Sequence, residues 1–83
     1  MLQEDINCVI EFNGKKYDSR HGGPFDRGSA DSWYCRPRDP HFYLEESYTS
    51  REVGAGNMTA EQIEAYIAGY EWNERFGGKK DYN

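Results

Sequence analysis

The clearest hydrophobic pattern in the chain occurs between residues 59 and 76. Thr59 and Gln62 have the spacing of a capping box, in which both side chains bond reciprocally to backbone N–H groups at a helix start. Apolar side chains then recur at helical spacing, and Gly77 follows the last turn. The apolar stripe consists of Ile63, Tyr66, Ile67 and Tyr70. The pattern predicts a helix over 59–76 with this stripe in the core.

A glycine interrupts the interior of this predicted helix. Gly69 costs about 1 kcal/mol relative to alanine at such a position. It belongs to a second line of mostly small side chains that also contains Ala65 and Ala68. We therefore expect another backbone to approach the helix closely at Gly69.

The N-terminal part alternates with the period of a strand. In INCVIEF the apolar side chains occupy every second position, and Asn13-Gly14 follows directly. Asn-Gly is the strongest short hairpin signal, because a type I′ turn needs positive φ at both central residues. The pattern predicts a β-hairpin over 6–19, with Ile10 and Phe12 in the core and Tyr17 opposite Ile10. A two-stranded ribbon is marginal alone, so it must pack on other elements.

A second helix is predicted over residues 26–36. Asp26 suits the N-cap, and Pro37 disfavours helical geometry at the residue before it. Trp33 and Tyr34 fall on one face of this helix with Ala30. We expect both aromatic side chains in the core against the last helix. The following segment RPRDPH would be a stiff arm, because it contains two prolines.

Together these patterns predict a single small α+β domain over 1–83. An N-terminal β-hairpin packs with two helices, which a Pro-rich connector joins. Residues 48–53, YTSREV, alternate and could add a short third strand. Residues 77–83 would form a flexible tail.

The charge of −5 is unevenly distributed along the chain. Residues 19–41 contain four arginines against three aspartates, whereas the last helix carries four glutamates and one arginine. An acidic chain is repelled by nucleic acid on average, so the charge favours a protein as partner. Arginines interleaved with aromatic side chains can also hold phosphates and stack bases, which leaves RNA as an alternative.

Sequence motifs for catalysis or metal binding are lacking. Cys8, His21, Cys35 and His41 do not have the paired spacing of zinc ligands, so we expect two free thiols and no metal. No Gly-rich phosphate loop or nucleophile elbow occurs. We expect no enzymatic activity, no cofactor and no small-molecule substrate. The chain also lacks a signal-peptide pattern and an apolar run of about 18 residues, which predicts a cytoplasmic protein without membrane association.

The stiff arm is the predicted contact surface. It lies outside the expected apolar faces, and arginine is enriched at the energetically dominant positions of protein interfaces. The predicted partner-binding residues are Arg27, Arg36, Arg38 and His41.

Two long motifs carry a resemblance to known proteins. FDRGSADSWYCRPRDPH and MTAEQIEAYIAGYEWNERFGGKKDY resemble a group of short, largely uncharacterised bacteriophage and prophage proteins. The likeness covers about residues 24–82 and is weak at 42–57. It implies a non-enzymatic accessory protein that binds a macromolecule of the host, a host protein in the first place, in the host cell cytoplasm.

A more distant similarity is to ribosome modulation factor and related small proteins. They share an Arg-Gly-opened helix, a Pro-containing connector and a second helix with the step formed here by Tyr66, Gly69 and Tyr70. This similarity implies the alternative function, a ribosome- or RNA-associated module. Those proteins are basic, whereas this chain is acidic.

Overall fold

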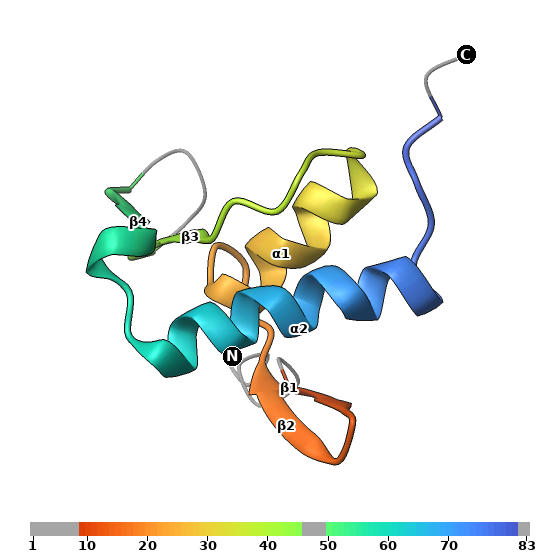
Figure 1. The fold of residues 1–83 in the computed structure, drawn as a ribbon, viewed down its shortest axis with the longest axis horizontal. Coiled ribbons are helices and arrows are strands. Elements are labelled where there is room, and N and C mark those ends of the chain that lie inside the picture. Colours follow the sequence, from red (N-terminus) through yellow and green to blue (C-terminus); the bar gives the residue numbers. More distant parts are fainter. Residues whose placement is uncertain (1–8, 46–49, 82–83) are drawn as a thin grey trace, which may run out of the picture.

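The computed structural model describes residues 9–45 and 50–81 of the chain (Figure 1). Two helices lie side by side, and a β-hairpin packs against both of them, on Phe25 of α1 and Ala68 of α2. In chain order the elements are β1 (Val9–Phe12), β2 (Lys15–Asp18), α1 (Pro24–Trp33), β3 (His41–Tyr43), β4 (Glu52–Gly54), the 3-10 turn η2 (Ala55–Asn57) and α2 (Ala60–Phe76). The predicted α+β fold, an N-terminal hairpin with two helices, is confirmed, and a second two-stranded sheet accompanies it.

The hairpin has the predicted turn and register. Asn13 and Gly14 have φ values of 54° and 79°, so both are in the left-handed region that a type I′ turn requires. The strands are antiparallel, and Ile10 pairs with Tyr17 as predicted. The first residues of the predicted hairpin, 6–8, lie outside the described residues.

The two helices touch through glycines. A Cβ atom on Gly28 would lie 1.9 Å from the Tyr66 carbonyl oxygen, and one on Gly69 would lie 2.0 Å from the Phe25 carbonyl oxygen. Neither position has room for a methyl group. The close backbone approach predicted at Gly69 is confirmed, and α1 contributes a matching glycine.

Helix α1 begins earlier than predicted. Its N-cap is Gly23 and Pro24 occupies the first turn, where a missing N–H costs nothing and the fixed φ suits a helix. Asp26 is not the N-cap, because it lies inside the first turn. Its carboxylate accepts a hydrogen bond from the Gly22 N–H at 2.9 Å and pairs with the Arg27 guanidinium.

The core is small and aromatic. Its buried apolar side chains are Phe12, Phe25, Phe42, Tyr43, Tyr66 and Ala68. The sequence predicts Phe12 and Tyr66 in the core, and both are buried. Ile10, Ile63, Ile67 and Tyr70, also predicted, are only partly buried. The sequence pattern did not single out Phe25, which is almost fully buried, and its ring packs between Tyr17 and Trp72 at centroid distances of 5.5 and 5.9 Å.

Trp33 and Tyr34 are not core residues, and the prediction that they cover α2 is wrong. Their exposed fractions are 41% and 39%. Helix α1 turns Phe25, Gly28 and Ser32 toward α2, because only the glycine face allows the backbones to approach closely. The two aromatic side chains at the end of α1 are therefore left on the surface.

The second sheet lies beside the helix pair. Phe42 of β3 pairs with Val53 of β4, and the Tyr43 N–H donates to the Gly22 carbonyl at 2.7 Å. Strand β4 corresponds to the end of the strand suggested over 48–53, of which residues 48 and 49 lie outside the described part. Neither helix in the described ranges combines the length and apolar character that crossing a bilayer requires.

Candidate protein-binding surface

Helix α1 ends in a tight turn that does not use glycine. The Arg36 N–H donates to the Asp31 carbonyl at 2.8 Å and the Cys35 N–H to the Ser32 carbonyl at 3.0 Å, the two bonds of a Schellman motif. Cys35 occupies its left-handed position with φ of 61°. A side chain there costs about 1–2 kcal/mol relative to right-handed geometry. The turn directs the connector, residues 34–40, back along α2 and leaves Trp33 and Tyr34 outside.

Two tyrosines of α2 fix the connector in place. The Asp39 N–H donates to the Tyr66 hydroxyl at 2.9 Å, and the Tyr70 hydroxyl donates to the Arg36 carbonyl at 2.5 Å. Both bonds join the backbone of the connector to the helix that carries the core. The connector is therefore held as a rigid segment.

A buried carboxylate lies beneath the connector. Asp31 accepts hydrogen bonds from the Tyr66 hydroxyl and, at 2.8 Å, from Arg36 Nε. Burial and the bond to Asp31 raise the pKa of Tyr66. His41 Nδ1 lies 3.9 Å from Asp31 but only 2.7 Å from the Asp39 carbonyl, which can only accept, so this nitrogen carries the proton. The cluster joins α1, α2 and the connector, which makes it a structural support of the surface above.

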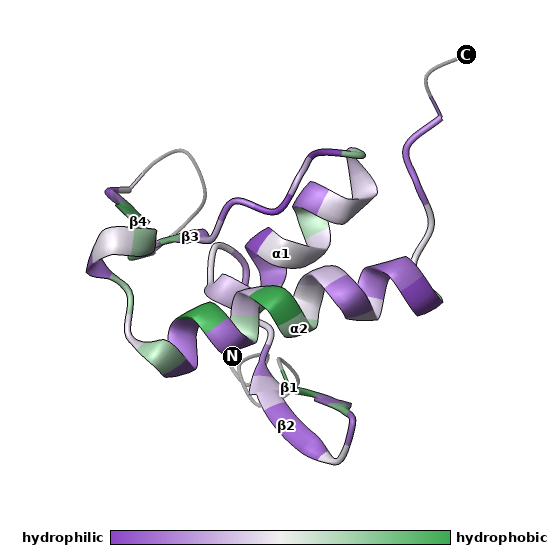
Figure 2. Cartoon of the chain, in the orientation of Figure 1, coloured by the Kyte–Doolittle hydropathy of each residue, from purple (hydrophilic) through white to green (hydrophobic). Residues whose placement is uncertain are grey.

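Cationic and aromatic side chains stack on the outer side of the connector. The Arg36 guanidinium lies 4.8 Å from the Tyr34 ring centroid and the Lys80 ammonium 5.8 Å from the same ring. Arg38 lies 4.9 Å from the centroid of Tyr70. Such contacts contribute about 0.5–1 kcal/mol each at exposed sites and hold long side chains in one orientation. We call the set of Trp33, Tyr34, Arg36, Arg38, Tyr70 and Lys80 the connector surface; Figure 2 shows how hydrophilic the connector itself is.

Two of the four predicted contact residues lie on the connector surface. The side chains of Arg36 and Arg38 are 44% and 49% exposed. His41 lies in β3 with only 14% of its side chain exposed, and its ring packs on Tyr66. Arg27 is buried against Asp26, so its prediction as a surface contact is wrong. A pattern of charges along the sequence does not show which face of a helix is buried. Arg27 precedes Gly28, where α1 contacts α2.

Sequence reasoning also missed the aromatic part of this surface. The sequence favours a core position for Trp33 and Tyr34, because they share a helix face with Ala30 and the apolar stripe of α2 needs a cover. The available signal was the pair Gly28 and Gly69, since two glycines at a helix contact define the buried face and exclude the opposite one.

A second polar cluster ties the C-terminal segment to α1. Lys79 Nζ donates to the Ser32 carbonyl at 3.0 Å and to Glu74, while the Lys80 N–H donates to the Trp33 carbonyl at 2.7 Å. The flexible tail predicted over 77–83 is therefore attached at these two lysines. Residues 82 and 83 lie outside the described part.

This cluster contains a serine beside a lysine, an arrangement that can serve nucleophilic catalysis when the lysine is neutral. The hydrogen bond with Glu74 raises the pKa of Lys79, so the ammonium stays protonated near neutral pH. The Ser32 side chain is fully buried, and its hydroxyl donates to Glu74 at 2.7 Å. The pair has neither a free base nor an accessible nucleophile.

Within residues 9–45 and 50–81, no three His, Cys, Asp or Glu side chains gather as ligands for an ion. Cys35 is a free, exposed thiol, and Cys8 lies outside the described residues.

No family model, curated protein or solved structure matches the chain.

Proposed function

We propose that the chain is a non-enzymatic binding module, a phage- or prophage-type accessory protein, which binds a host protein in the host cytoplasm through the connector surface. One observation carries the proposal. Two large aromatic side chains, Trp33 and Tyr34, are exposed beside arginines on a backbone that is hydrogen-bonded to the core. Tryptophan, tyrosine and arginine are the side chains that dominate protein interfaces.

Rigidity supports this interpretation. Association costs free energy for each side chain or loop that it orders. The connector backbone is already fixed at Arg36 and Asp39, and the Tyr34 ring is already flanked by Arg36. A partner would therefore order little of this surface on binding.

The charge distribution supports a protein rather than RNA. Arg36 pairs with Asp31 at 2.8 Å, and Arg38 lies 3.5 Å from Glu71. A protein binds phosphates through cationic side chains that displace the counterions of the nucleic acid. The guanidinium groups of Arg36 and Arg38 are already paired with carboxylates, so they are less suited to this role. RNA binding remains the competing function that the experiment must separate.

The test is capture of partners by the tagged full-length chain from a bacterial lysate, with and without nuclease. The double variant Trp33→Ala/Tyr34→Ala should reduce recovery of the captured protein at least tenfold, which corresponds to about 1.4 kcal/mol. Leu44→Ala is the matched control, since Leu44 is 52% exposed on another part of the molecule. It should capture the partner like the parent chain. Circular dichroism of each variant checks that the fold is retained.

Two outcomes contradict the proposal. Equal capture by the folded double variant would show that the aromatic pair is not the binding surface. Loss of capture after nuclease treatment, with a steep fall in affinity as salt rises, would favour RNA.

A further inference from the structure

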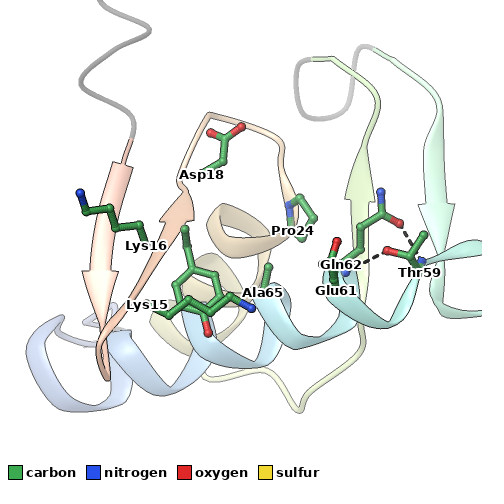
Figure 3. A pocket seen from close by; sticks show the side chains of 9 residues that line it. Lys15, Lys16, Asp18, Pro24, Thr59, Glu61, Gln62 and Ala65 are labelled. Atoms are coloured by element: carbon green, nitrogen blue, oxygen red, sulfur yellow. Dashed lines mark hydrogen bonds between the residues drawn. The ribbon is translucent and has the colours of Figure 1, made fainter.

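A groove of about 520 Å³ lies between β2 and the start of α2 (Figure 3). Its size falls within the range of about 300–1,000 Å³ that is usual for ligand sites. One wall is β2, the other is the first turns of α2, and Pro24 of α1 lies between them. The groove is separate from the connector surface and shares no residue with it. Its lining residues are Lys15, Lys16, Tyr17, Asp18, Pro24, Thr59, Glu61, Gln62 and Ala65.

The groove runs along the edge of β2. All four consecutive residues of the strand line it, although successive side chains of a strand point to opposite faces. A cavity on one face would meet the side chains of every second residue only. In Figure 3 the Lys16 side chain is directed away from α2, so this residue reaches the groove from the strand edge.

This edge offers backbone hydrogen bonds. Among the described residues β2 pairs with β1 alone, so its other edge has no partner strand there. An edge strand presents a row of unpaired N–H and C=O groups, which can pair with an added strand. The edge is about 13 Å long at 3.3 Å per residue, enough for about four residues of an extended chain.

The side chains around the groove are already positioned. Glu64 accepts hydrogen bonds from Lys15 Nζ at 3.1 Å and from the Tyr17 hydroxyl at 3.0 Å. Thr59 and Gln62 bond reciprocally in the capping box, the dashed lines of Figure 3. Their side-chain oxygens thus accept hydrogen bonds from the backbone of the helix start. The Tyr17 ring, Pro24 and Ala65 supply apolar contact area.

The remaining polar groups give the groove its charge preference. Glu61, on the α2 wall, has no ion-pair partner within the described residues, and the Asp18 carboxylate is bonded to the Arg20 N–H. Lys15 is already neutralised by Glu64. Lys16 also lines the groove, but its side chain is directed away from α2. The charges that face the groove are therefore the carboxylates of Asp18 and Glu61, which attract a basic ligand.

We propose that this groove binds an extended basic peptide segment of another protein by strand addition to β2. The backbone of the peptide pairs with the edge of β2, which gives affinity. A lysine or arginine side chain lies between Glu61 and Asp18, and an apolar side chain lies on Tyr17 and Ala65. The occupied surface differs from the connector surface, so either proposal can fail alone.

The test is an NMR titration of the ¹⁵N-labelled full chain with a capped peptide of about six residues, alternating valine and lysine. Saturable shifts should concentrate at the amides of Lys16, Asp18 and Ala65 and leave those of Tyr34 and Arg38 unchanged. A peptide with the same charges but proline in place of valine should not bind, because proline cannot donate to the strand edge.

Charge is tested with a matched pair of variants. Glu61→Gln should weaken the valine–lysine peptide about two- to fivefold, as expected for one exposed ion pair. Glu52→Gln removes the same charge from exposed β4 and should bind like the parent chain.

Three results would overturn the proposal. They are the absence of saturable shifts along β2, equal binding of the proline peptide, and equal binding of a valine–glutamate peptide. Sedimentation of the free chain tests whether a second copy of the chain binds the edge instead. A concentration-dependent dimer that shifts the same amides would show that it does.

Discussion

Replacing Gly69 by alanine should destabilise the protein, although alanine is the better helix former. The added methyl group would lie 2.0 Å from the Phe25 carbonyl oxygen and 2.8 Å from its carbon. Ordinary contact begins at 3.4 Å, so the two helices would have to separate locally by about 1.4 Å. A gap of 0.5–1 Å already removes about a quarter to a half of each dispersion contact.

The size of the effect follows from two opposing contributions. Inserting a methyl group into a packed contact costs about 1–3 kcal/mol, and a clash between backbones belongs at the upper end. Alanine returns about 1 kcal/mol through helix propensity. The net loss should be about 2 kcal/mol, from a total stability of about 4–12 kcal/mol for a chain of this size. The melting temperature should fall by about 8–16 °C.

Urea and thermal unfolding followed by circular dichroism measure this change. Gly56→Ala is the matched control, because nothing lies within 4 Å of a methyl group at that position in η2. It should be neutral or stabilising by up to about 1 kcal/mol. If Gly69→Ala proved as stable as Gly56→Ala, the helices would not be in backbone contact and the assignment of the buried face of α1 would be wrong.

Two further substitutions test the supports of the connector surface. Tyr66→Phe removes one of the two hydrogen-bond donors to Asp31 and the acceptor of the Asp39 N–H, and urea unfolding should show a loss of about 1–3 kcal/mol. The pKa of Tyr66 is raised above its ordinary value of about 10, so the hydroxyl stabilises the fold fully below pH 10 and less as the pH rises further. Above about pH 10 the parent should therefore lose more stability than Tyr66→Phe. An equal decline in both would contradict the buried bond. Cys35→Gly should raise the stability by up to about 1 kcal/mol in thermal melts under reductant, because glycine accepts the φ of 61° without strain. Cys35→Ala should give no such gain, and a glycine variant less stable than the alanine variant would contradict the left-handed geometry.

Local signals in the sequence were sufficient for the hairpin turn and for the start of α2. Asn13 and Gly14 accept positive φ, and Thr59 and Gln62 cap the helix, whatever lies around them. These are interactions between residues a few positions apart, so the chain encodes them directly. The close approach at Gly69 was also visible, because a glycine in a helix interior needs a reason.

The candidate surface depended on contacts that no local pattern describes. Which face of α1 is buried was decided by the fit of Gly28 against α2, and this choice exposed Trp33 and Tyr34 and buried Arg27. The support beneath the connector joins Asp31 to Tyr66, 35 residues apart in the sequence. The sequence by itself determined that two helices and a hairpin form, because short-range bonds and periodicity suffice for that. Only the tertiary structure decided which side chains remained outside, because burial depends on the shape of the element packed against each face.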